Sequence, residues 1–300
     1  MAEASNGAPG NALAPIPNGI FVAHQGSDDN GELWYTQFVN NSWTKDALVS
    51  NTGMSESPAV GTFNGLIYVF HQGFKDNGSL WYSVFDGRTW RPDVQVPNTG
   101  MSASPSVAAY NGQFYCFHQG FKNDGTLWFN VFNGGSWLGD LKVPETGMSS
   151  SPSAVAFNGQ LYVFHQGFGK SGDLWYNILD NQRGWLGDKQ VPNTGMSDGL
   201  SAVVFKNRIL CFHNGSKDSG ELWYNTFDPS RGWTGDKKVP NVGMSASPSA
   251  VNYQGTLYVF HQGFNNAEEL WYTTSTDGNN WSKDARVANT GISEGPGAFA

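Results

Sequence analysis

One tripeptide, His-X-Gly, recurs along the chain at a nearly fixed interval. Its six copies begin at His24, His71, His118, His165, His213 and His261. Successive copies are 47, 47, 47, 48 and 48 residues apart. A fixed period of this length is typical of propellers and solenoids, in which each repeat packs on its neighbours. The period therefore constrains the fold more strongly than the length of 300 residues, which alone would suggest two domains.

One copy of the repeat shows the expected elements. Four short segments alternate with turns, and we expect them to be strands at 151–157, 160–166, 173–180 and 185–191. Asn158-Gly159 between the first two is a strong hairpin signal. Since no segment has helical periodicity, four antiparallel strands per unit predict one propeller blade rather than a helical solenoid.

The two ends of the chain complete the blade count. Residues 18–25 match the second strand of the repeat, and residues 291–300 match its loop and first strand. The C-terminus would therefore supply the strand that the N-terminal blade lacks, which removes free sheet edges. The sequence predicts an all-β, six-bladed β-propeller at 18–300, with four antiparallel strands per blade, one blade closed by both termini, and a flexible segment at 1–17.

The charge pattern argues against polyanionic partners. The formal net charge is −8, and the 17 Lys and Arg residues are scattered. Binding to phosphates or to anionic lipid needs clustered cations. We expect no nucleic-acid partner and no membrane insertion. Residues 1–17 also lack the basic and apolar regions of a signal peptide, which predicts a cytoplasmic protein or one released by a non-classical route.

The candidate binding sites lie in grooves between neighbouring blades. Two longer polar loops of each repeat share one face, and each groove would be lined by one loop of each kind. The first candidate column is the His-Gln pair, which offers donors and acceptors for sugar hydroxyls. Its members are His24-Gln25, His71-Gln72, His118-Gln119, His165-Gln166, His213 (followed by Asn214) and His261-Gln262. The alternative is a histidine at a strand end that satisfies a neighbouring loop.

Two tryptophan columns follow. The first Trp of each repeat is suited to stacking on the apolar face of a sugar, or to packing between blades. Its members are Trp34, Trp81, Trp128, Trp175, Trp223 and Trp271. A later Trp is followed by an Asp three residues on, as in Trp137 and Asp140. We interpret this carboxylate as a structural group that ties down a turn.

The last column is the Asn-Thr-Gly-Met-Ser loop, whose Asn and Ser side chains are natural partners of hydroxyls and also natural turn-formers. Its asparagines are Asn51, Asn98, Asn193, Asn241 and Asn289, with Glu145 in one copy. Its serines are Ser55, Ser102, Ser149, Ser197, Ser245 and Ser293.

The repetition itself favours binding over catalysis. A catalytic centre needs residues that break the repeat, whereas these polar residues recur once per blade. We expect no enzyme activity, no cofactor and no bound metal, and glycans or glycoconjugates on cell surfaces as partners, bound with avidity. A protein-interaction propeller is the alternative of another class. A sialidase-like hydrolase is a further alternative, because 275–281 loosely resembles an Asp-box.

Three segments carry a family resemblance. NGQLYVFHQG (158–167), DLWYN (173–177) and VPETGMSSSPSAV (143–155) resemble units of β-propeller lectins. The likeness is to the fucose-binding lectins of Photorhabdus, which are typically seven-bladed, to the GlcNAc-binding lectin of Agrocybe aegerita, and more loosely to tachylectin-2. The resemblance implies shallow sugar sites between blades. Six blades favour GlcNAc, with L-fucose as the alternative.

The copies differ enough to predict unequal sites. The His213 copy has Asn214 where the others have Gln and Ser216 where most have Phe, and Ile292 replaces Met in the last copy. We expect fewer than six sites to bind a sugar equally.

Overall fold

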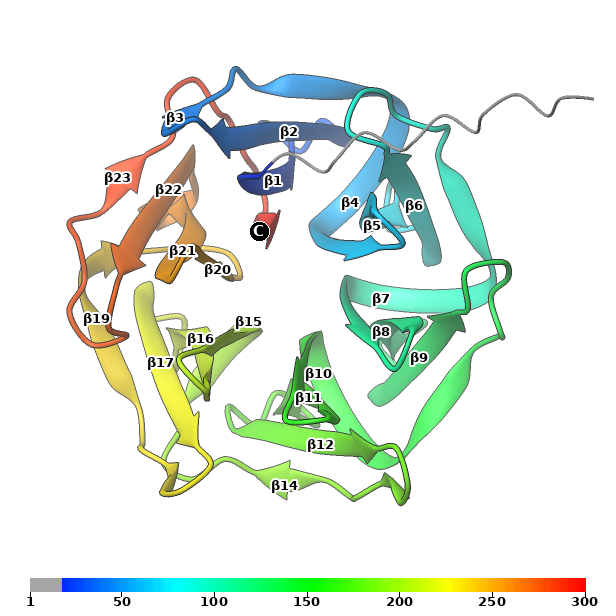
Figure 1. Cartoon of the computed structure of the whole chain (residues 1–300), viewed down its shortest axis with the longest axis vertical. Coiled ribbons are helices and arrows are strands. Elements are labelled where there is room, and N and C mark those ends of the chain that lie inside the picture. Colours follow the sequence, from blue (N-terminus) through cyan, green and yellow to red (C-terminus); the bar gives the residue numbers. More distant parts are fainter. Residues whose placement is uncertain (1–17) are drawn as a thin grey trace, which may run out of the picture.

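The computed structural model describes residues 18–300, which form six antiparallel blades around a central axis (Figure 1). The prediction of an all-β, six-bladed β-propeller is therefore confirmed. The predicted flexible segment 1–17 lies outside the described residues. Among residues 18–300, no helix is long and apolar enough to cross a bilayer.

The first three blades follow the chain order. Blade I contains β24 (Gly297–Phe299), β1 (Ile20–Gln25), β2 (Glu32–Val39), β3 (Ser42–Trp43) and the start of β4 (Ala47–Phe63). Blade II contains the rest of β4, β5 (Leu66–Gly73), β6 (Ser79–Phe85) and the start of β7 (Val94–Tyr110). Blade III contains the rest of β7, β8 (Gln113–Gly120), β9 (Thr126–Phe132) and the start of β10 (Leu141–Phe157).

The last three blades repeat this order with shorter outer strands. Blade IV contains the rest of β10, β11 (Gln160–Gly167), β12 (Leu174–Asp180), β13 (Gly184–Trp185) and β14 (Lys189–Gln190). Blade V contains β15 (Met196–Phe205), β16 (Arg208–Gly215), β17 (Glu221–Asp228), β18 (Gly232–Trp233) and β19 (Lys237–Gly243). Blade VI contains β20 (Ser249–Tyr253), β21 (Thr256–Gly263), the turn η1 (Phe264–Asn266), β22 (Ala267–Ser275) and β23 (Ala285–Arg286).

Three strands pass from one blade into the next. β4, β7 and β10 each have 17 residues. In β4, Leu48 pairs with β2 of blade I, whereas Ala59 pairs with β5 of blade II, and the register shifts between Ser55 and Ala59. Because one strand serves as the outer strand of one blade and the innermost strand of the next, neighbouring blades are held in a fixed relation.

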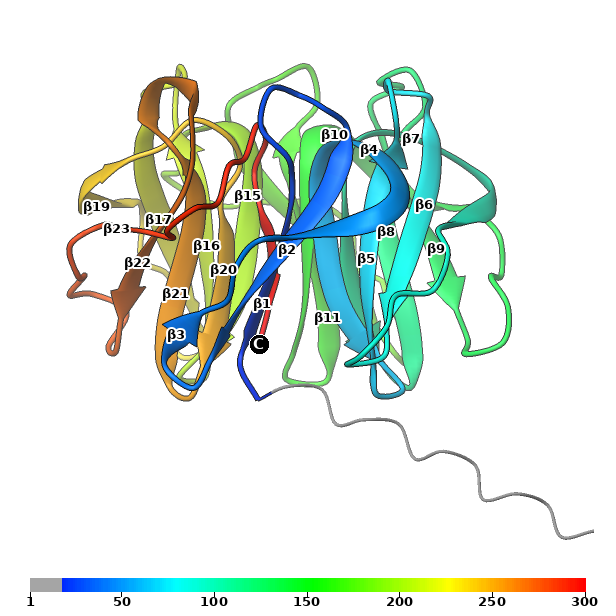
Figure 2. The same ribbon diagram turned by 90° about the horizontal axis from the view of Figure 1, so that it is seen from above.

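Both ends of the chain close the ring. β24 pairs with β1 through Phe299–Phe21, Ala298–Val22 and Gly297–Ala23. The C-terminal strand therefore lies beside the N-terminal one at the innermost position of blade I (Figures 1 and 2). The predicted closure by both termini is confirmed, and it pairs the inner edge of β1.

The later tryptophan of each repeat packs on the preceding blade. Trp137 of blade III meets Phe70 of blade II edge to face, with ring centroids 5.8 Å apart at 89°. Trp233 of blade V meets Phe164 of blade IV in the same way, at 5.9 Å and 89°. Edge-to-face aromatic pairs add to the large apolar area that such side chains bury. The later tryptophans therefore form much of the aromatic contact between adjacent blades.

The predicted fourth strand was too long. In blade IV the segment 185–191 divides into the pairs of β13 and β14, which contact the end and the beginning of β12. The interruption contains Asp188, whose carboxylate turns inward to His165. The strand is interrupted at Asp188 because its side chain points inward to the buried His165, and the backbone there does not pair with β12.

Candidate functional site

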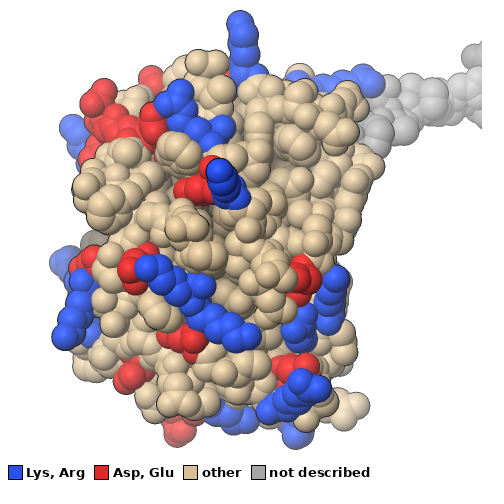
Figure 3. All heavy atoms as spheres, turned by 90° about the vertical axis from the view of Figure 1, so that its left-hand side faces the viewer, with Lys and Arg blue, Asp and Glu red and all other residues tan. Residues whose placement is uncertain are grey.

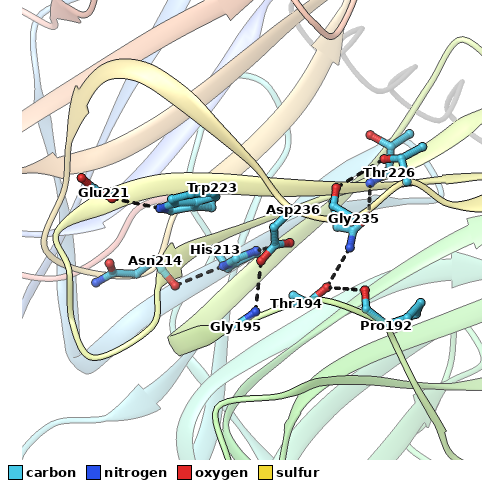
Figure 4. Close-up of polar contacts among 12 residues, drawn as sticks. Pro192, Thr194, Gly195, His213, Asn214, Glu221, Trp223, Thr226, Gly235 and Asp236 are labelled. Atoms are coloured by element: carbon cyan, nitrogen blue, oxygen red, sulfur yellow. Dashed lines mark hydrogen bonds and ion pairs between the residues drawn. The ribbon is translucent and has the colours of Figure 1, made fainter.

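The six histidines of His-X-Gly lie inside the blades. Each has 0% exposure: His24, His71, His118, His165, His213 and His261. Each ring binds on both sides. In His118, Nδ1 lies 3.1 Å from the carbonyl oxygen of Gln119, and Nε2 lies 2.9 Å from Oδ1 of Asp140. The structure thus places these predicted sugar contacts behind the surface, where they hold the Asp that follows each later Trp (Figure 4).

The glutamines next to these histidines are buried as well. Gln25, Gln72, Gln119, Gln166 and Gln262 are at most 4% exposed. Gln166 Nε2 donates to the carbonyl oxygens of Met196 and Ser197, and Gln262 does the same toward Ile292 and Ser293. The His-Gln column therefore supports the loops of the binding face rather than lining it.

Open grooves lie between neighbouring blades, as predicted. One of them, groove II, has a volume of about 670 Å³ and is lined by Trp81, Phe74 and Asp93 of blade II and by Asn51 of the preceding strand β4. Groove I has about 520 Å³ and contains Trp34, Asp46 and Asn289. Groove IV has about 310 Å³ and contains Trp175, Phe168 and Asp188. Equivalent residues of three repeats thus line equivalent grooves, so the first tryptophan column belongs to the surface.

The loop asparagines are turn-formers, and two of them also line grooves. Asn51, Asn98, Asn193, Asn241 and Asn289 have positive φ angles between 53° and 61°, together with Glu145 at 52°. Asparagine adopts this left-handed conformation more readily than most residues. The side chains of Asn51 and Asn289 are exposed and line grooves II and I. The left-handed turn favours asparagine at this position, and in grooves I and II the asparagine side-chain amide faces the groove.

The loop serines hold a loop of their own blade, since Ser102 pairs with Gln119 in blade III and Ser149 with Gln166 in blade IV. Ser102 Oγ accepts from the backbone N–H of Asn123 at 3.0 Å, and Ser149 accepts from Lys170 at 2.9 Å. The same contact recurs at Ser55, Ser197 and Ser245. Ser293 instead donates to the carbonyl oxygen of Gly26 across the closure. These predicted site residues therefore hold the loop that follows His-X-Gly in the same blade.

Sequence reasoning missed the phenylalanine that follows His-Gln-Gly in four copies. Phe74, Phe121, Phe168 and Phe264 are exposed by 43%, 48%, 69% and 54%. A Cβ built on Gly31 or Gly53 would collide with Phe74, so the ring lies directly over two glycines of the preceding blade. Two features of the sequence could have revealed it. An aromatic residue stands in an otherwise polar loop, and glycines recur at fixed positions of the preceding copy.

The axial mouth of the propeller carries carboxylates. Glu56, Asp198 and Glu294 occupy the same position of three repeats, next to the small residues that line the central channel. Burial, followed by the charge of Glu56, raises the pKa of Glu294 from 4.5 to about 7. Burial also raises the pKa of Glu56.

This shift predicts a pH-dependent stability. The folded state holds the Glu294 proton up to about pH 7, whereas the unfolded chain releases it near pH 4.5. Stability therefore falls as the pH rises through this window. Glu294→Gln should raise the melting temperature at pH 8 by roughly 2 °C, since solvent screening limits the gain to about 1 kcal/mol. Thermal melts at pH 4 and pH 8 check this, and an equal shift at both would contradict it.

Comparisons with known proteins show the fold. The sequence matches no protein-family model and no curated protein. The fucose-specific lectin from Aleuria aurantia is 17% identical, with a TM-score of 0.68, and the match covers 90% of this chain and 91% of that chain. AofleA from Arthrobotrys oligospora is 13% identical, with a TM-score of 0.62 and coverage of 96% and 90%. The chain shares their architecture.

Two further solved structures share this fold. Another structure of the Aleuria aurantia lectin, 16% identical with a TM-score of 0.63 and coverage of 87% and 89%, is described as a six-bladed β-propeller with fucose recognition. An α-L-arabinofuranosidase from Clostridium thermocellum is 15% identical, with a TM-score of 0.56 and coverage of 82% and 97%. Both binding proteins and an enzyme therefore share this fold.

Proposed function

We propose that this chain is a multivalent lectin that binds terminal sugars of glycans in the grooves between its blades. The observation that carries the proposal is the recurrence of an indole face beside an exposed asparagine amide in grooves I and II. Sugars present an apolar face that stacks on aromatic rings and hydroxyls that pair with amides. Several weak sites on one ring gain avidity on a surface that displays many copies of one glycan.

GlcNAc is the sugar that we propose first. Its acetamido group combines a methyl group with one N–H donor and one carbonyl acceptor. Groove II offers the Phe74 ring for the methyl group and the amides of Asn51 and Asn77 for the polar atoms. Blade number no longer separates the candidates, because a six-bladed lectin with fucose recognition shares this fold. That likeness favours L-fucose as the second candidate.

Binding rather than hydrolysis is supported by the carboxylates of groove II. Glycosidases generally use a pair of carboxyl groups flanking the scissile bond. Asp93 is the single carboxylate among the described residues that line groove II, and it accepts hydrogen bonds from His71 and Ser83. The Asp-box-like turn at 275–281 is held by its own Asp277, which accepts from the backbone N–H groups of Asn279 and Asn280.

Isothermal titration tests the proposal. The intact protein is titrated, with chelator present, against the methyl glycosides of GlcNAc and L-fucose and against a sialyl glycoside. We expect heat from GlcNAc or fucose at more than one site per chain. Trp81→Ala and Trp175→Ala together should lower the number of occupied sites. Ala109→Ser is the matched control, because Ala109 is exposed beside the Asn111-Gly112 turn at the opposite end of the strands.

The remaining outcomes separate the other functions. Absence of heat with all three glycosides would contradict the lectin and favour a protein-interaction propeller. Binding of the sialoside alone, at one site per chain, would favour the hydrolase.

A further inference from the structure

In four blades the groove tryptophan already has a hydrogen-bond acceptor within the protein. The indole N–H of Trp34 donates to Glu32 at 3.1 Å, and those of Trp223 and Trp271 donate to Glu221 and Glu269, each at 3.2 Å. In blade III, Trp128 donates to Asp124 at 3.2 Å. These carboxylates cap the indole, so its N–H is not available to a ligand.

Blades II and IV lack this cap. The residue two positions before Trp81 is Ser79, and the residue two positions before Trp175 is Asp173. Asp173 is one methylene shorter than the glutamates at its position. The indole nitrogen of Trp81 is buried without any hydrogen-bond partner. Within residues 18–300 the structure also gives no acceptor for the N–H of Trp175.

The residue paired across the sheet separates the two uncapped tryptophans from three of the four capped ones, the exception being Trp34, which pairs with Leu48. Trp81 pairs with Gln95, and Trp175 pairs with Gln190. Three of the capped tryptophans instead face a cation. Lys142 lies over the Trp128 ring at 6.0 Å, Lys238 forms an ion pair with Glu221 at 2.5 Å, and Arg286 forms an ion pair with Glu269. In these three blades a charged side chain therefore lies beside the tryptophan or its cap.

The exposed phenylalanine gives a third, independent distinction. Blades II and IV carry Phe74 and Phe168 at the groove, whereas blades I and V have Ser27 and Ser216 at that position. Blades III and VI have the phenylalanine but also the capped indole and the opposing cation. Of the six blades, only II and IV combine an uncapped indole, a neutral residue paired with the tryptophan across the sheet, and an exposed phenylalanine at the groove.

We propose that grooves II and IV form a class of stronger sugar sites, in which an oxygen of the bound sugar accepts a hydrogen bond from the free indole N–H of Trp81 or Trp175. For Trp81, whose indole nitrogen is buried without a partner, a ligand acceptor recovers the free energy that an unpaired buried donor costs. In groove II the amide of Asn77 lies over Gly73, beside which the indole nitrogen packs in other blades. Because Asn77 is exposed, a sugar oxygen reaches the N–H by displacing this side chain.

This inference rests on the proposed function and specifies the number and identity of its main sites. The capping residue is the specificity-determining feature. A glutamate two residues before the tryptophan, or Asp124 in blade III, occupies the indole N–H, whereas Ser79 and Asp173 leave it without an acceptor.

The test transfers the cap between blades. Ser79→Glu and Asp173→Glu in one chain install the acid found at Glu32, Glu221 and Glu269. Isothermal titration with the methyl glycosides of GlcNAc and L-fucose should show two stronger sites in the unmodified protein and a roughly tenfold weaker affinity at those sites in the double variant. Ser79→Ala with Asp173→Ser is the matched control and should retain both sites.

The reciprocal variant strengthens the test. Glu269→Ser with Arg286→Gln gives blade VI the pattern of blade II, since Phe264 is already present, and should add a third stronger site. Six equal sites, or stronger sites unaffected by the added glutamates, would overturn the two classes while leaving the lectin intact. Absence of binding by the unmodified protein would overturn the lectin and the two classes together.

Discussion

Removal of residues 297–300 is expected to lower the free energy of unfolding by more than about 4 kcal/mol, the range reached only by severe structural lesions. The truncation deletes β24 and leaves the inner edge of β1 unpaired. It also removes Phe299 and Ala298, which pack against the clusters containing Phe21 and Val22. Urea denaturation followed by tryptophan fluorescence measures the loss. We further expect aggregation, because an exposed inner strand edge pairs with other chains.

A circular permutant provides the control. Opening the chain at Asn158-Gly159 and joining Ala300 to Asn18 retains β24 but places it in a covalent hairpin. In blade II the corresponding positions Thr62 and Gly65 are separated by two residues, so a two-residue linker has the right length. The permutant should be close to the original in stability. A truncated protein within about 1 kcal/mol of the full chain would show that closure contributes little.

His118→Ala is expected to cost about 3–5 kcal/mol of stability, the usual consequence of removing one partner of a buried polar pair. The substitution leaves a void in blade III and deprives Asp140 of its Nε2 partner at 2.9 Å. The carboxylate is then held inside the fold with its side chain only 15% exposed. Chemical denaturation of the variant against the original measures the effect.

A double-mutant cycle separates the pair from the void. His118→Ala combined with Asp140→Ala should cost less than the sum of the single substitutions, because the second change removes the orphaned carboxylate. Sugar affinity at grooves II and IV should be unchanged in the folded variant. Unchanged stability together with weaker sugar binding would instead make the histidine a ligand contact.

Sequence periodicity was sufficient to predict the architecture, because the number of blades and their closure depend on where strands and turns recur along the backbone. The spacing of His-X-Gly, the Asn-Gly turns and the matching fragments at both ends defined the blades and their closure. The strand boundaries were less certain at the outer edge. In 185–191 the alternating pattern continues through Asp188, and only the buried imidazole of His165 explains why the strand divides there.

The site was predicted less completely, because recurrence does not reveal which way a side chain points. His118 and Trp128 recur with equal regularity and pair across the same two strands. The first is buried, whereas the second is partly exposed beside the blade surface. The partner of each histidine lies 22 or 23 residues further along the chain, too far for a local pattern. The caps on the indoles were missed because they depend on single departures such as Ser79 and Asp173.

The position of the closure has a practical consequence for how the molecule is displayed. β1 begins on the face of the Asn-Gly turns and runs toward the loop that precedes Trp34, so residue 18 enters the ring on the face opposite the grooves (Figure 2). The flank of the ring seen in Figure 3 carries interspersed acidic and basic side chains rather than one dominant sign. A chain immobilised through its N-terminal end would therefore direct all of its grooves away from the support. Such an orientation suits a sensor surface or a particle coat that must engage several glycan ends at once.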